Sequence, residues 1–289
     1  MEERITGHTE LVGLIATPIR HSKSPEMHNA AFRKLGLDLA YLAFDIQEYQ
    51  LEDALKGYKA LNVIGSNVSM PYKEAVIPYM DELTDAAKLC HAVNTIKNVD
   101  GYFIGHNTDG VGFMNGLKDK KWDVINKEMT VLGAGGAAKA IVVQAALDGV
   151  KKINIYNIKD DFYKVIEDKI EEIKKYSDTT ITINDIKDLD LLRKDIQNSY
   201  LLVNATGVGM GKLEGQCLIP DTSYFHSDLK VADVIYAVEK TKLLQMAEDI
   251  GLDYMNGERM MLFQGAESFK MWTGKEMPID YMKDFLNIK

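Results

Sequence analysis

The 289-residue sequence is poor in cysteine and has no long apolar run. Its two cysteines, Cys90 and Cys217, are far apart, so they provide neither a disulfide framework nor a CxxC metal site, and we expect two reduced, buried thiols. No apolar run approaches the roughly 20 residues that cross a bilayer, and the N-terminus lacks the apolar region of a signal peptide. We therefore expect a cytoplasmic protein with no membrane partner and no metal site.

The sequence has fewer basic than acidic residues. There are 34 Lys and Arg residues against 43 Asp and Glu, a net charge of -9, which argues against nucleic acid or anionic lipid as the main partner. Hydrophobic residues make up 46% and charged residues 27%, which are ordinary values for a globular protein and exclude disorder. At about 150 residues per domain, the length predicts two domains. A small-molecule ligand is expected.

Strand and helix patterns alternate in the first part of the chain. The apolar run LVGLIAT (11–17) predicts a strand, and Ser24 and Pro25 then open a helix that we expect Ser24 to cap and Gly36 to end. Further strands are predicted at 40–44 and 62–68. The Asp-Gly pair at 100–101 lies between two β-rich runs and predicts a hairpin, so this part mixes parallel and antiparallel strands.

A more regular series follows from residue 129. Six short apolar runs, mostly separated by helical segments, predict a doubly wound parallel sheet. These runs are MTVL, KKINIYN, ITI, YLLVNATG, VADVIY and LDYMN. From about residue 258 the pattern is helical only, and we expect these C-terminal helices to return and pack on the first domain. The predicted fold class is therefore α/β with two domains.

The segment LGAGGAA is typical of a dinucleotide-binding loop. Gly133, Gly135 and Ala138 match GxGxx[G/A], in which the first residue allows a tight turn, the second a close approach of pyrophosphate and the third helix-to-strand packing. A predicted strand precedes the loop and a predicted helix follows it, so backbone N–H groups of the loop can hold a phosphate. Ala134, Gly136 and Ala137 complete the candidate site. The alternative is a glycine-rich turn without a ligand.

The end of the next predicted strand bears on the choice of cofactor. It reads Asn157, Ile158, Lys159, Asp160, with a carboxylate and no arginine. A carboxylate there suits the ribose hydroxyls of NAD, whereas an arginine suits the extra phosphate of NADP. We therefore expect NAD to be preferred over NADP, with Asn157 and Asp160 at the cofactor. Asp160 as a simple cap of the next helix remains an alternative.

Several further motifs occur in a fixed order along the chain. They are SKSP (22–25), NVSMPYK (67–73), AVNTI (92–96), GHNTDG (105–110), NATGVGM (204–210) and QGA (264–266). Together with LGAGGAA they resemble the motif set of the shikimate dehydrogenase family, with similarity to its quinate/shikimate dehydrogenase subgroup over essentially the whole chain.

The resemblance implies a fold and a reaction. It implies an N-terminal α/β substrate-binding and catalytic domain (1–109), a Rossmann-like domain (110–257) for the dinucleotide, and C-terminal helices (258–289) on the first domain. The implied reaction is hydride transfer between a nicotinamide cofactor and shikimate, giving 3-dehydroshikimate, with quinate as an additional candidate substrate. We expect a monomer or homodimer.

The resemblance also implies residue roles. Lys73 and Asp109 match the catalytic pair that handles the proton, and Ser22 and Ser24 match the hydroxyls that hold the substrate carboxylate. The remaining matches lie around the substrate ring (Ser69, Asn94, Gln264 and Tyr236) and on the cofactor side (Thr206, Gly207 and Gly257). Plain structural alternatives exist: Lys73 as a solvated side chain, Asp109 as a helix cap, Tyr236 as packing, and Ser69 and Asn94 as loop residues.

Four residues, at three places in the chain, depart from the family pattern. Ala237 and Val238 replace a proline dipeptide, and Arg259 stands where the family has a glycine. Arg259 could point to solvent, reach a cofactor phosphate or block the nicotinamide site. His106 replaces a polar residue and is expected in a surface turn. These departures leave two alternatives open, a shikimate-sensing protein without turnover and a dehydrogenase of another polyhydroxy acid.

Overall fold

The structure is a computed structural model that describes residues 5–20 and 22–288. By internal contacts the chain divides into two compact units, which we call unit 1 and unit 2. Unit 1 comprises the residues up to Thr108 together with those from Gln264 onward, and unit 2 runs from Asp109 to Phe263. Each unit contains a six-stranded sheet with helices, so the predicted α/β class is confirmed.

Unit 1 contains six strands and most of the short helices. Its strands are β1 (Glu10–Ala16), β2 (Leu39–Asp45), β3 (Gly65–Val68), β4 (Glu82–Leu83), β5 (Thr95–Val99) and β6 (Tyr102–His106). Its helices are α1 (Ser24–Leu35), α2 (Leu51–Ala60), α3 (Tyr72–Ala75), α4 (Asp85–Cys90), the part of α10 (Glu258–Thr273) from Gln264 onward, and α11 (Ile279–Leu286). Short 3-10 turns cover Glu48–Gln50 and Ile77–Tyr79.

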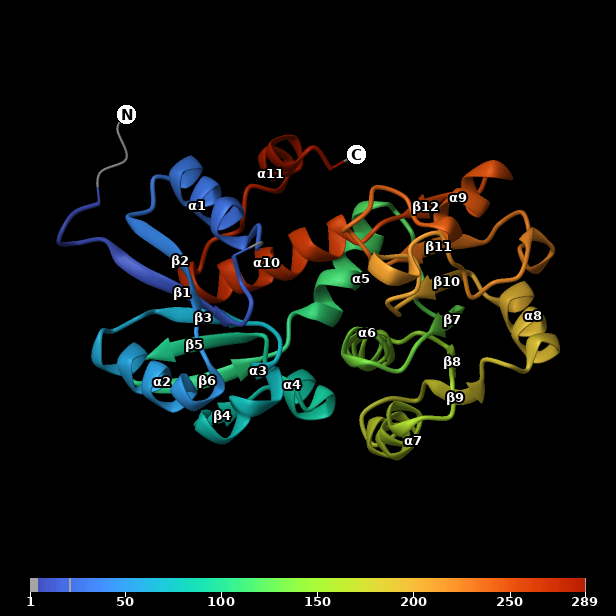
Figure 1. Cartoon of the computed structure of the whole chain (residues 1–289), viewed down its shortest axis with the longest axis horizontal. Helices are drawn as coiled ribbons and strands as arrows, with labels where there is room; N and C mark the ends of the chain where they lie inside the picture. Colours follow the sequence, from blue (N-terminus) through green and yellow to red (C-terminus); the bar gives the residue numbers. More distant parts are fainter. Residues whose placement is uncertain (1–4, 21, 289) are drawn as a thin grey trace. The chain divides into compact units, whose positions relative to one another are not determined.

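The sheet of unit 1 combines parallel and antiparallel pairing. Its order is β2-β1-β3-β5-β6-β4, with β1 parallel to β2 and β3, and β5 antiparallel to β3 and β6 (Figure 1). The predicted hairpin is confirmed, because Val99 pairs with Tyr102 across a turn in which Asp100 and Gly101 have φ of 52° and 86°. Positive φ at both turn residues matches the right-handed twist of the strands.

Helices cover both faces of this sheet. Leu51, Leu55 and Tyr58 of α2 pack on the face that carries Ile15 and Val68. The opposite face receives α10, since Trp272 contacts Gly65 so closely that a Cβ there would lie 2.2 Å from the indole nitrogen. The C-terminal helices therefore return to unit 1, as predicted.

The first helix begins at Ser24, the residue expected to cap it. Ser24 is itself the first residue of α1, Lys23 occupies the N-cap position without a side-chain bond, and the Ser22 hydroxyl accepts the Ser24 backbone N–H at 3.2 Å. The prediction that Ser24 caps the helix is therefore wrong, because Ser22 supplies the acceptor. Gly36 ends α1 with φ of 64°, as expected.

Unit 2 has a single, entirely parallel sheet. Its strands are β7 (Glu128–Leu132), β8 (Lys152–Asn157), β9 (Thr180–Asp185), β10 (Leu201–Asn204), β11 (Lys230–Asp233) and β12 (Tyr254–Met255). Its helices are α5 (Asp109–Asp119), α6 (Gly136–Leu147), α7 (Asp161–Ile173), α8 (Leu189–Asn198), α9 (Lys242–Asp249) and the first residues of α10. Short 3-10 turns cover Gly211–Leu213 and Thr222–Tyr224.

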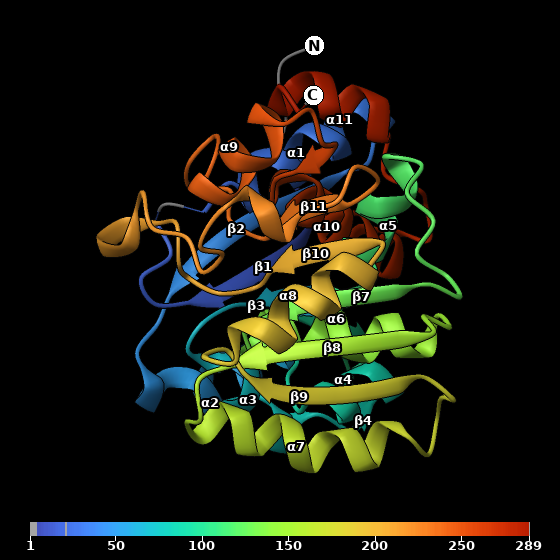
Figure 2. The same ribbon diagram turned by 90° about the vertical axis from the view of Figure 1, so that its right-hand side faces the viewer.

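The strand order in unit 2 is that of a Rossmann sheet. The order β9-β8-β7-β10-β11-β12 is the arrangement 3-2-1-4-5-6 when the six strands are counted from β7 (Figure 2). All six predicted strands are present. In such a sheet the order reverses beside the first strand, here between β7 and β10, and ligands bind at the carboxyl ends of the strands there. Within the described residues no helix is long and apolar enough to cross a membrane.

An aromatic cluster in unit 1 encloses a histidine. His28 of α1 is fully buried, stacks on Tyr41 at a centroid distance of 4.6 Å, and lies 5.2 Å from the ring of Trp272. Neither ring nitrogen of His28 has a hydrogen-bond partner among the described residues. Burial lowers the pKa of His28 from 6.5 to about 3, so the ring stays neutral while the protein is folded.

We expect the buried neutral His28 to make folding sensitive to acid. In the unfolded chain His28 takes up a proton below pH 6.5, whereas the folded chain does not until about pH 3, so stability is lost as the pH falls through this window. His28→Phe should reduce the pH dependence of the unfolding free energy below pH 6.5 by about 1.4 kcal/mol per pH unit. Urea unfolding at several pH values measures it. His8→Phe, at an exposed position, is the control and should retain the wild-type slope; an unchanged slope in His28→Phe would contradict the prediction.

Candidate active site

The strand directions of unit 1 bring the predicted substrate residues to one edge of its sheet. β1 and β3 end at this edge, and β5, which is antiparallel to β3, begins there. Ser69 follows β3 and donates its N–H to Ile15 at 3.0 Å, while Asn94 precedes β5 and accepts at its carbonyl from Val68 at 2.8 Å. Lys73 lies on α3, where its carbonyl accepts the Val93 N–H at 2.7 Å. Backbone hydrogen bonds therefore tie the segments that carry Ser69, Lys73 and Asn94 to neighbouring segments at this edge.

The loop after β1 contributes the two serines to the same edge. Ser22 and Ser24 are both half-buried at the start of α1. The Ser24 hydroxyl hydrogen-bonds to the phenol of Tyr41, which lies in β2 and is fully buried. Tyr41 in turn donates to Asn67 Oδ1 at 2.8 Å. The orientation of Ser24 is thereby coupled to the interior of unit 1.

Asn67, which belongs to the motif NVSMPYK but is not among the predicted site residues, is the centre of a buried polar network. Its Nδ2 lies 3.1 Å from each of three acceptors, the Asn94 carbonyl, Thr95 Oγ1 and Ser268 Oγ. The hydroxyl oxygens of Thr95 and Ser268 are hydrogen-bonded to each other at 2.7 Å. Ser268 also donates to the Gln264 carbonyl one helical turn earlier, at 3.0 Å. The network therefore links strand β3 to α10 at the level of Gln264.

Asn94 belongs to this network through its side chain. Its Oδ1 accepts the backbone N–H of Thr108 at 2.8 Å, and its Nδ2 donates to the Thr108 hydroxyl at 2.9 Å. Asn94 is therefore buried and orders the chain just before Asp109, rather than being an ordinary loop residue. The signal in the sequence was the presence of polar residues inside short strands whose neighbours are apolar, since such groups need partners when buried.

Removing Asn67 should destabilise unit 1. Asn67→Ala removes one hydrogen bond from each of four buried groups, namely the Tyr41 hydroxyl, the Asn94 carbonyl, Thr95 Oγ1 and Ser268 Oγ. We expect a loss of about 3 kcal/mol in the free energy of unfolding. Denaturant titration followed by tryptophan fluorescence measures it. Glu52→Ala, which removes an exposed ion pair with Lys56 in the same unit, is the control and should cost under about 0.5 kcal/mol. Equal losses in the two variants would contradict the role assigned to Asn67.

In unit 2 the glycine-rich loop has the expected geometry. Gly133 follows β7 with φ of 107°, and a Cβ there would lie 2.8 Å from the Thr206 methyl group. Gly135 is the N-cap residue of α6, and a Cβ built on Gly135 or on Gly136 meets nothing within 4 Å. Ala138 is fully buried. Open space above a helix N-terminus with free N–H groups fits a pyrophosphate.

Asp160 is the N-cap residue of α7, which is one of the two alternatives considered for it. Its Oδ1 accepts the Tyr163 N–H at 3.0 Å and so caps α7, and the same atom accepts from Asn157 Nδ2 at 2.8 Å. The carboxylate therefore lies at the end of β8, held by a residue of that strand. Ile158 beside it is 53% exposed.

The first turn of α5 is held against α6 by a glycine. Asp109 is the first residue of α5, and a Cβ on the next residue, Gly110, would lie 2.3 Å from the Ala140 carbonyl oxygen. Only glycine permits this backbone approach. Within unit 2, Asp109 is therefore fixed relative to the helix that follows the glycine-rich loop.

Thr206 and Gly207, Tyr236, and Gly257 follow β10, β11 and β12 respectively. Thr206 follows β10, and its hydroxyl donates to Asn204 Oδ1 at 2.7 Å. Gly257 packs against the backbone after β11, because a Cβ there would lie 2.0 Å from the Val234 carbonyl oxygen. Gly207 and Tyr236 are exposed, Tyr236 by 51%. Close packing therefore explains Gly257, and Tyr236 is not a packed strand-end residue.

Arg259 has a partner within unit 2. Its Nε donates to Asp119 Oδ2 at 3.0 Å in an ion pair whose side chains are only 11% and 16% exposed. A Cβ on Gly116 would lie 3.2 Å from Arg259 Cβ, so this glycine makes room for the arginine on α5. Of the three possibilities left open by the sequence, Arg259 does not simply point to solvent.

His106 differs from its predicted environment. It is the last residue of β6 and is half-buried, so the prediction of a surface turn is wrong. Its carbonyl accepts the Asn94 N–H at 3.0 Å, and burial lowers the pKa of its imidazole. The structure has no disulfide between the two cysteines; Cys90 is buried, as expected, whereas Cys217 is only half-buried, contrary to the expectation.

Two comparisons with known proteins can be set against this geometry. The family described as the shikimate dehydrogenase substrate binding domain matches residues 14–96, and that described as the shikimate 5'-dehydrogenase C-terminal domain matches residues 257–284. A shikimate dehydrogenase (NADP(+)) of Listeria monocytogenes is 54% identical over 284 residues, which cover 98% of each chain. The chain belongs to the shikimate dehydrogenase family. Members of this family are NAD(P)-dependent oxidoreductases that interconvert shikimate and 3-dehydroshikimate.

Solved structures support the same assignment. Shikimate 5-dehydrogenase from Listeria monocytogenes, in complex with shikimate and NAD, is 53% identical with a TM-score of 0.96 over 99% of both chains. Quinate dehydrogenase from Corynebacterium glutamicum, in complex with NAD, is 28% identical with a TM-score of 0.86, covering 97% of this chain and 99% of the other. The resemblance to the shikimate dehydrogenase family is thus confirmed.

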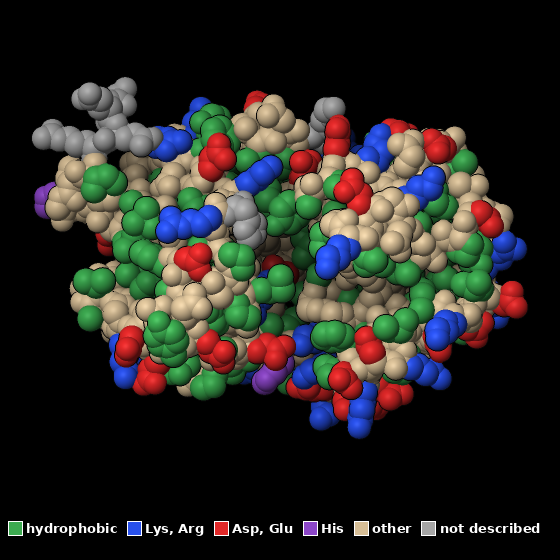
Figure 3. All heavy atoms as spheres, viewed as in Figure 1, with side chains coloured by type: hydrophobic (Ala, Val, Ile, Leu, Met, Phe, Trp, Pro, Cys, Tyr) green, Lys and Arg blue, Asp and Glu red, His purple; other side chains and the backbone are tan. Residues whose placement is uncertain are grey.

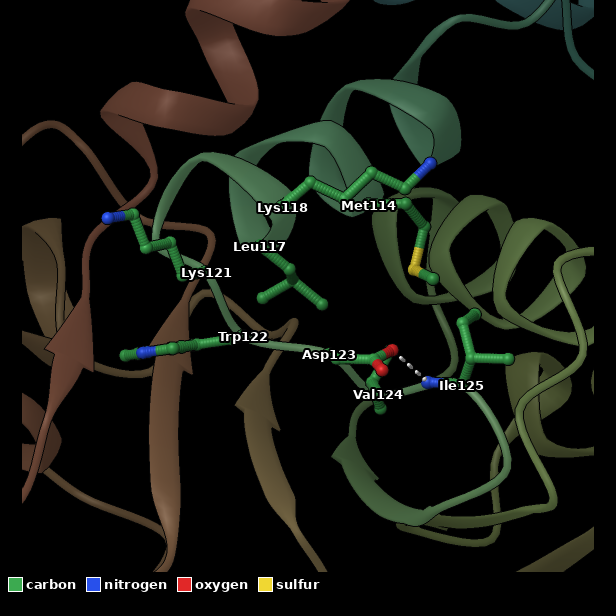
Figure 4. Close-up of a pocket in the computed structure, with 8 residues that line it drawn as sticks. All are labelled: Met114, Leu117, Lys118, Lys121, Trp122, Asp123, Val124 and Ile125. Atoms are coloured by element: carbon green, nitrogen blue, oxygen red, sulfur yellow. Dashed lines mark hydrogen bonds between the residues drawn. The ribbon is translucent and has the colours of Figure 1, made fainter.

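A cavity of about 240 Å³ lies elsewhere in unit 2 of this shikimate dehydrogenase family member (Figure 4). Met114, Leu117 and Trp122 form part of its wall, and Asp123 accepts the Ile125 N–H at 3.0 Å beside it. Ile125 precedes β7, so the cavity is near the start of that strand, whereas ligands of Rossmann sheets bind at the strand ends. On the visible surface, acidic and basic side chains are interspersed in both units (Figure 3).

Proposed function

We propose that this chain is a shikimate dehydrogenase, which oxidises the ring alcohol of shikimate to 3-dehydroshikimate and catalyses the reverse reaction. The supporting observation is the convergence of Ser22, Ser24, Ser69, Lys73 and Asn94 at one edge of the sheet of unit 1. We assign residues 1–109 to substrate binding and catalysis, 110–257 to the dinucleotide, and 258–289 to helices that complete the first domain.

Lys73 and Asp109 are the proposed catalytic pair. Oxidising an alcohol requires a group that accepts the hydroxyl proton, and reducing the ketone requires the same group to return it. Lys73 holds this proton on its Nζ, and the Asp109 carboxylate orients the amine. Both residues have fixed backbones, Lys73 through Val93 and Asp109 through the close approach of Gly110 to α6.

Polar side chains of unit 1 bind the substrate in this proposal. Ser22 and Ser24 donate to the carboxylate, with neutral hydroxyls in place of an arginine. Ser69, Asn94 and Gln264 bond to the ring hydroxyls, for which amides and hydroxyls are suitable because they both donate and accept. Tyr236, exposed after β11, completes the site on the side of the nicotinamide.

The cofactor site is assigned to the carboxyl ends of the strands in unit 2. A bound nicotinamide supplies the hydride acceptor for oxidation and the hydride donor for reduction. The loop Gly133–Ala134–Gly135–Gly136–Ala137–Ala138 holds the pyrophosphate with N–H groups at the start of α6. Asn157 and Asp160 hold the adenosine ribose, and Thr206, Gly207 and Gly257 shape the nicotinamide side.

NAD is the preferred cofactor in this proposal, although the curated relatives are named for NADP. The observation in its favour is Asp160 at the end of β8 next to Ile158, a place that lacks an arginine for the extra phosphate. The similar structure from Listeria monocytogenes contains NAD. Quinate is a second candidate substrate, supported by the likeness to the quinate dehydrogenase.

Ile158→Arg should shift the preference toward NADP. The exposed position places a guanidinium where the 2'-phosphate is expected, so the ratio of kcat/KM for NADP to that for NAD should rise at least about tenfold. Steady-state rates with both cofactors measure it. Tyr176→Arg, which adds the same charge at an exposed position beyond α7, should leave the ratio unchanged. A wild-type protein that already favours NADP would refute the proposed preference.

Lys73→Gln should abolish most of the turnover. Loss of a general acid–base group costs about 10²- to 10⁴-fold in kcat, while the KM for shikimate should change little. Formation of reduced nicotinamide with shikimate, and separately with quinate, measures it by absorbance. Lys88→Gln, at an exposed lysine of α4, is the matched control and should keep full activity. Near-wild-type kcat in Lys73→Gln would exclude the proposed mechanism.

The alternatives give different results in the same assays. A sensor would bind shikimate in calorimetry and form no reduced cofactor, and the departures at Ala237 and Val238 are the observation that motivates it. A dehydrogenase of another polyhydroxy acid would be silent with shikimate and quinate but active in a wider substrate panel. Sedimentation would distinguish the monomer from the homodimer.

A further inference from the structure

A buried carboxylate is hydrogen-bonded to one residue in each of two loops near the proposed cofactor site, those at 204–208 and 234–236. Asp233 is the last residue of β11 and is 1% exposed. Its Oδ1 accepts the Ile235 N–H at 3.0 Å. Its Oδ2 accepts from Asn204 Nδ2 at 3.0 Å and from the Thr241 hydroxyl at 2.8 Å. The carboxylate therefore joins the end of β10, the loop after β11 and the N-terminus of α9.

Asn204 transmits this arrangement to the loop after β10. While its Nδ2 donates to Asp233 and to the Val208 carbonyl, its Oδ1 accepts both the N–H and the hydroxyl of Thr206. The Thr206 hydroxyl in turn accepts the Val208 N–H at 3.0 Å. The turn at 204–208 is thus closed by side-chain bonds that begin at Asp233.

The loop at 234–236 is held by the other carboxylate oxygen of Asp233, Oδ1. The bond from Ile235 holds the backbone one residue before Tyr236, and the Ile235 carbonyl accepts the Gly257 N–H at 3.0 Å. Because the segment after Tyr236 has Ala237 and Val238 rather than proline, its backbone has no ring to restrict it. The hydrogen bond from the Ile235 N–H to Asp233 therefore restrains the backbone of this loop in place of a proline ring.

We propose that ionised Asp233 is a positioning residue for the cofactor, which sets the loops at 204–208 and 234–236 and makes cofactor binding depend on pH. It does not touch the reacting atoms and acts through Asn204, Thr206 and Ile235. The inference rests on the proposed cofactor role of Thr206 and Gly207 and on the proposed place of Tyr236 in the substrate site, on the side of the nicotinamide.

The surroundings of Asp233 make its ionisation sensitive to conditions. Burial raises its pKa from 3.8 to about 6, and the bonds from Asn204, Ile235 and Thr241 oppose this rise. The Cys217 thiol lies close enough for the Asp233 charge to raise its pKa, although burial is the larger cause, and Lys242 acts on that thiol in the opposite direction. Protonation removes the charge from an acceptor of three bonds and weakens them.

Asp233→Asn tests the proposal with a residue of the same shape. We expect the dissociation constant and KM for NAD to rise about tenfold at pH 7.5, with kcat and the KM for shikimate within about twofold of wild type. In the wild type, affinity for NAD should fall about tenfold between pH 7.5 and pH 5, and the variant should show no such fall. NAD is the probe because the 2'-phosphate of NADP itself titrates near pH 6.

Two control variants distinguish a failure of the Asp233 proposal from a failure of the proposed function. Asp195→Asn removes another buried carboxylate of unit 2, which accepts from the Tyr156 hydroxyl at 2.6 Å, and should lower the melting temperature without changing the affinity for NAD. Gly135→Val introduces a side chain into open space on the loop and should abolish NAD binding in a folded protein. Wild-type affinity and pH dependence in Asp233→Asn, with Gly135→Val inactive, would overturn this inference alone. A wild type that binds neither NAD nor NADP would instead overturn the proposed function.

Discussion

The hydrogen bonds of Asn67 are the interaction on which the arrangement of unit 1 depends. A buried amide must satisfy its donors and acceptor inside the protein, and Asn67 does so with groups from β2, β5 and α10. Those partners are the segments that carry or adjoin the proposed substrate residues. Loss of the network would therefore affect the stability of the unit and the placement of Ser24 and Gln264 together.

In unit 2 the corresponding hydrogen-bond acceptor is a buried carboxylate, that of Asp233. Asp233 accepts three hydrogen bonds at the ends of two parallel strands, where the chain must leave the sheet in irregular loops. Close backbone approaches at Gly110 and Gly257 fix neighbouring segments without side chains. Rigid surroundings of this kind suit a site that must present loops to a ligand, because little ordering remains to be done when the ligand binds.

Local patterns predicted the elements well and the details of their ends less well. The six strands of unit 2, the Asp100–Gly101 hairpin and the glycine at the end of α1 follow from short-range chemistry. Ser24, expected to cap α1, is its first residue and Ser22 supplies the acceptor; His106, expected in a turn, ends a strand. Such errors concern one or two residues at the end of an element. Which residue ends the element there depends on which of several hydrogen-bond partners is used.

The sequence by itself determined the fold class, the family and the identity of the candidate residues, because periodicity and ordered motifs are written in neighbouring positions. The tertiary structure decided what these residues contact. It paired Arg259 with Asp119, which is distant in sequence, and left His28 buried without a hydrogen-bond partner among the described residues. It also placed Asp233 beneath two loops. Burial and partners depend on segments brought together only by folding, and no local pattern contains that information.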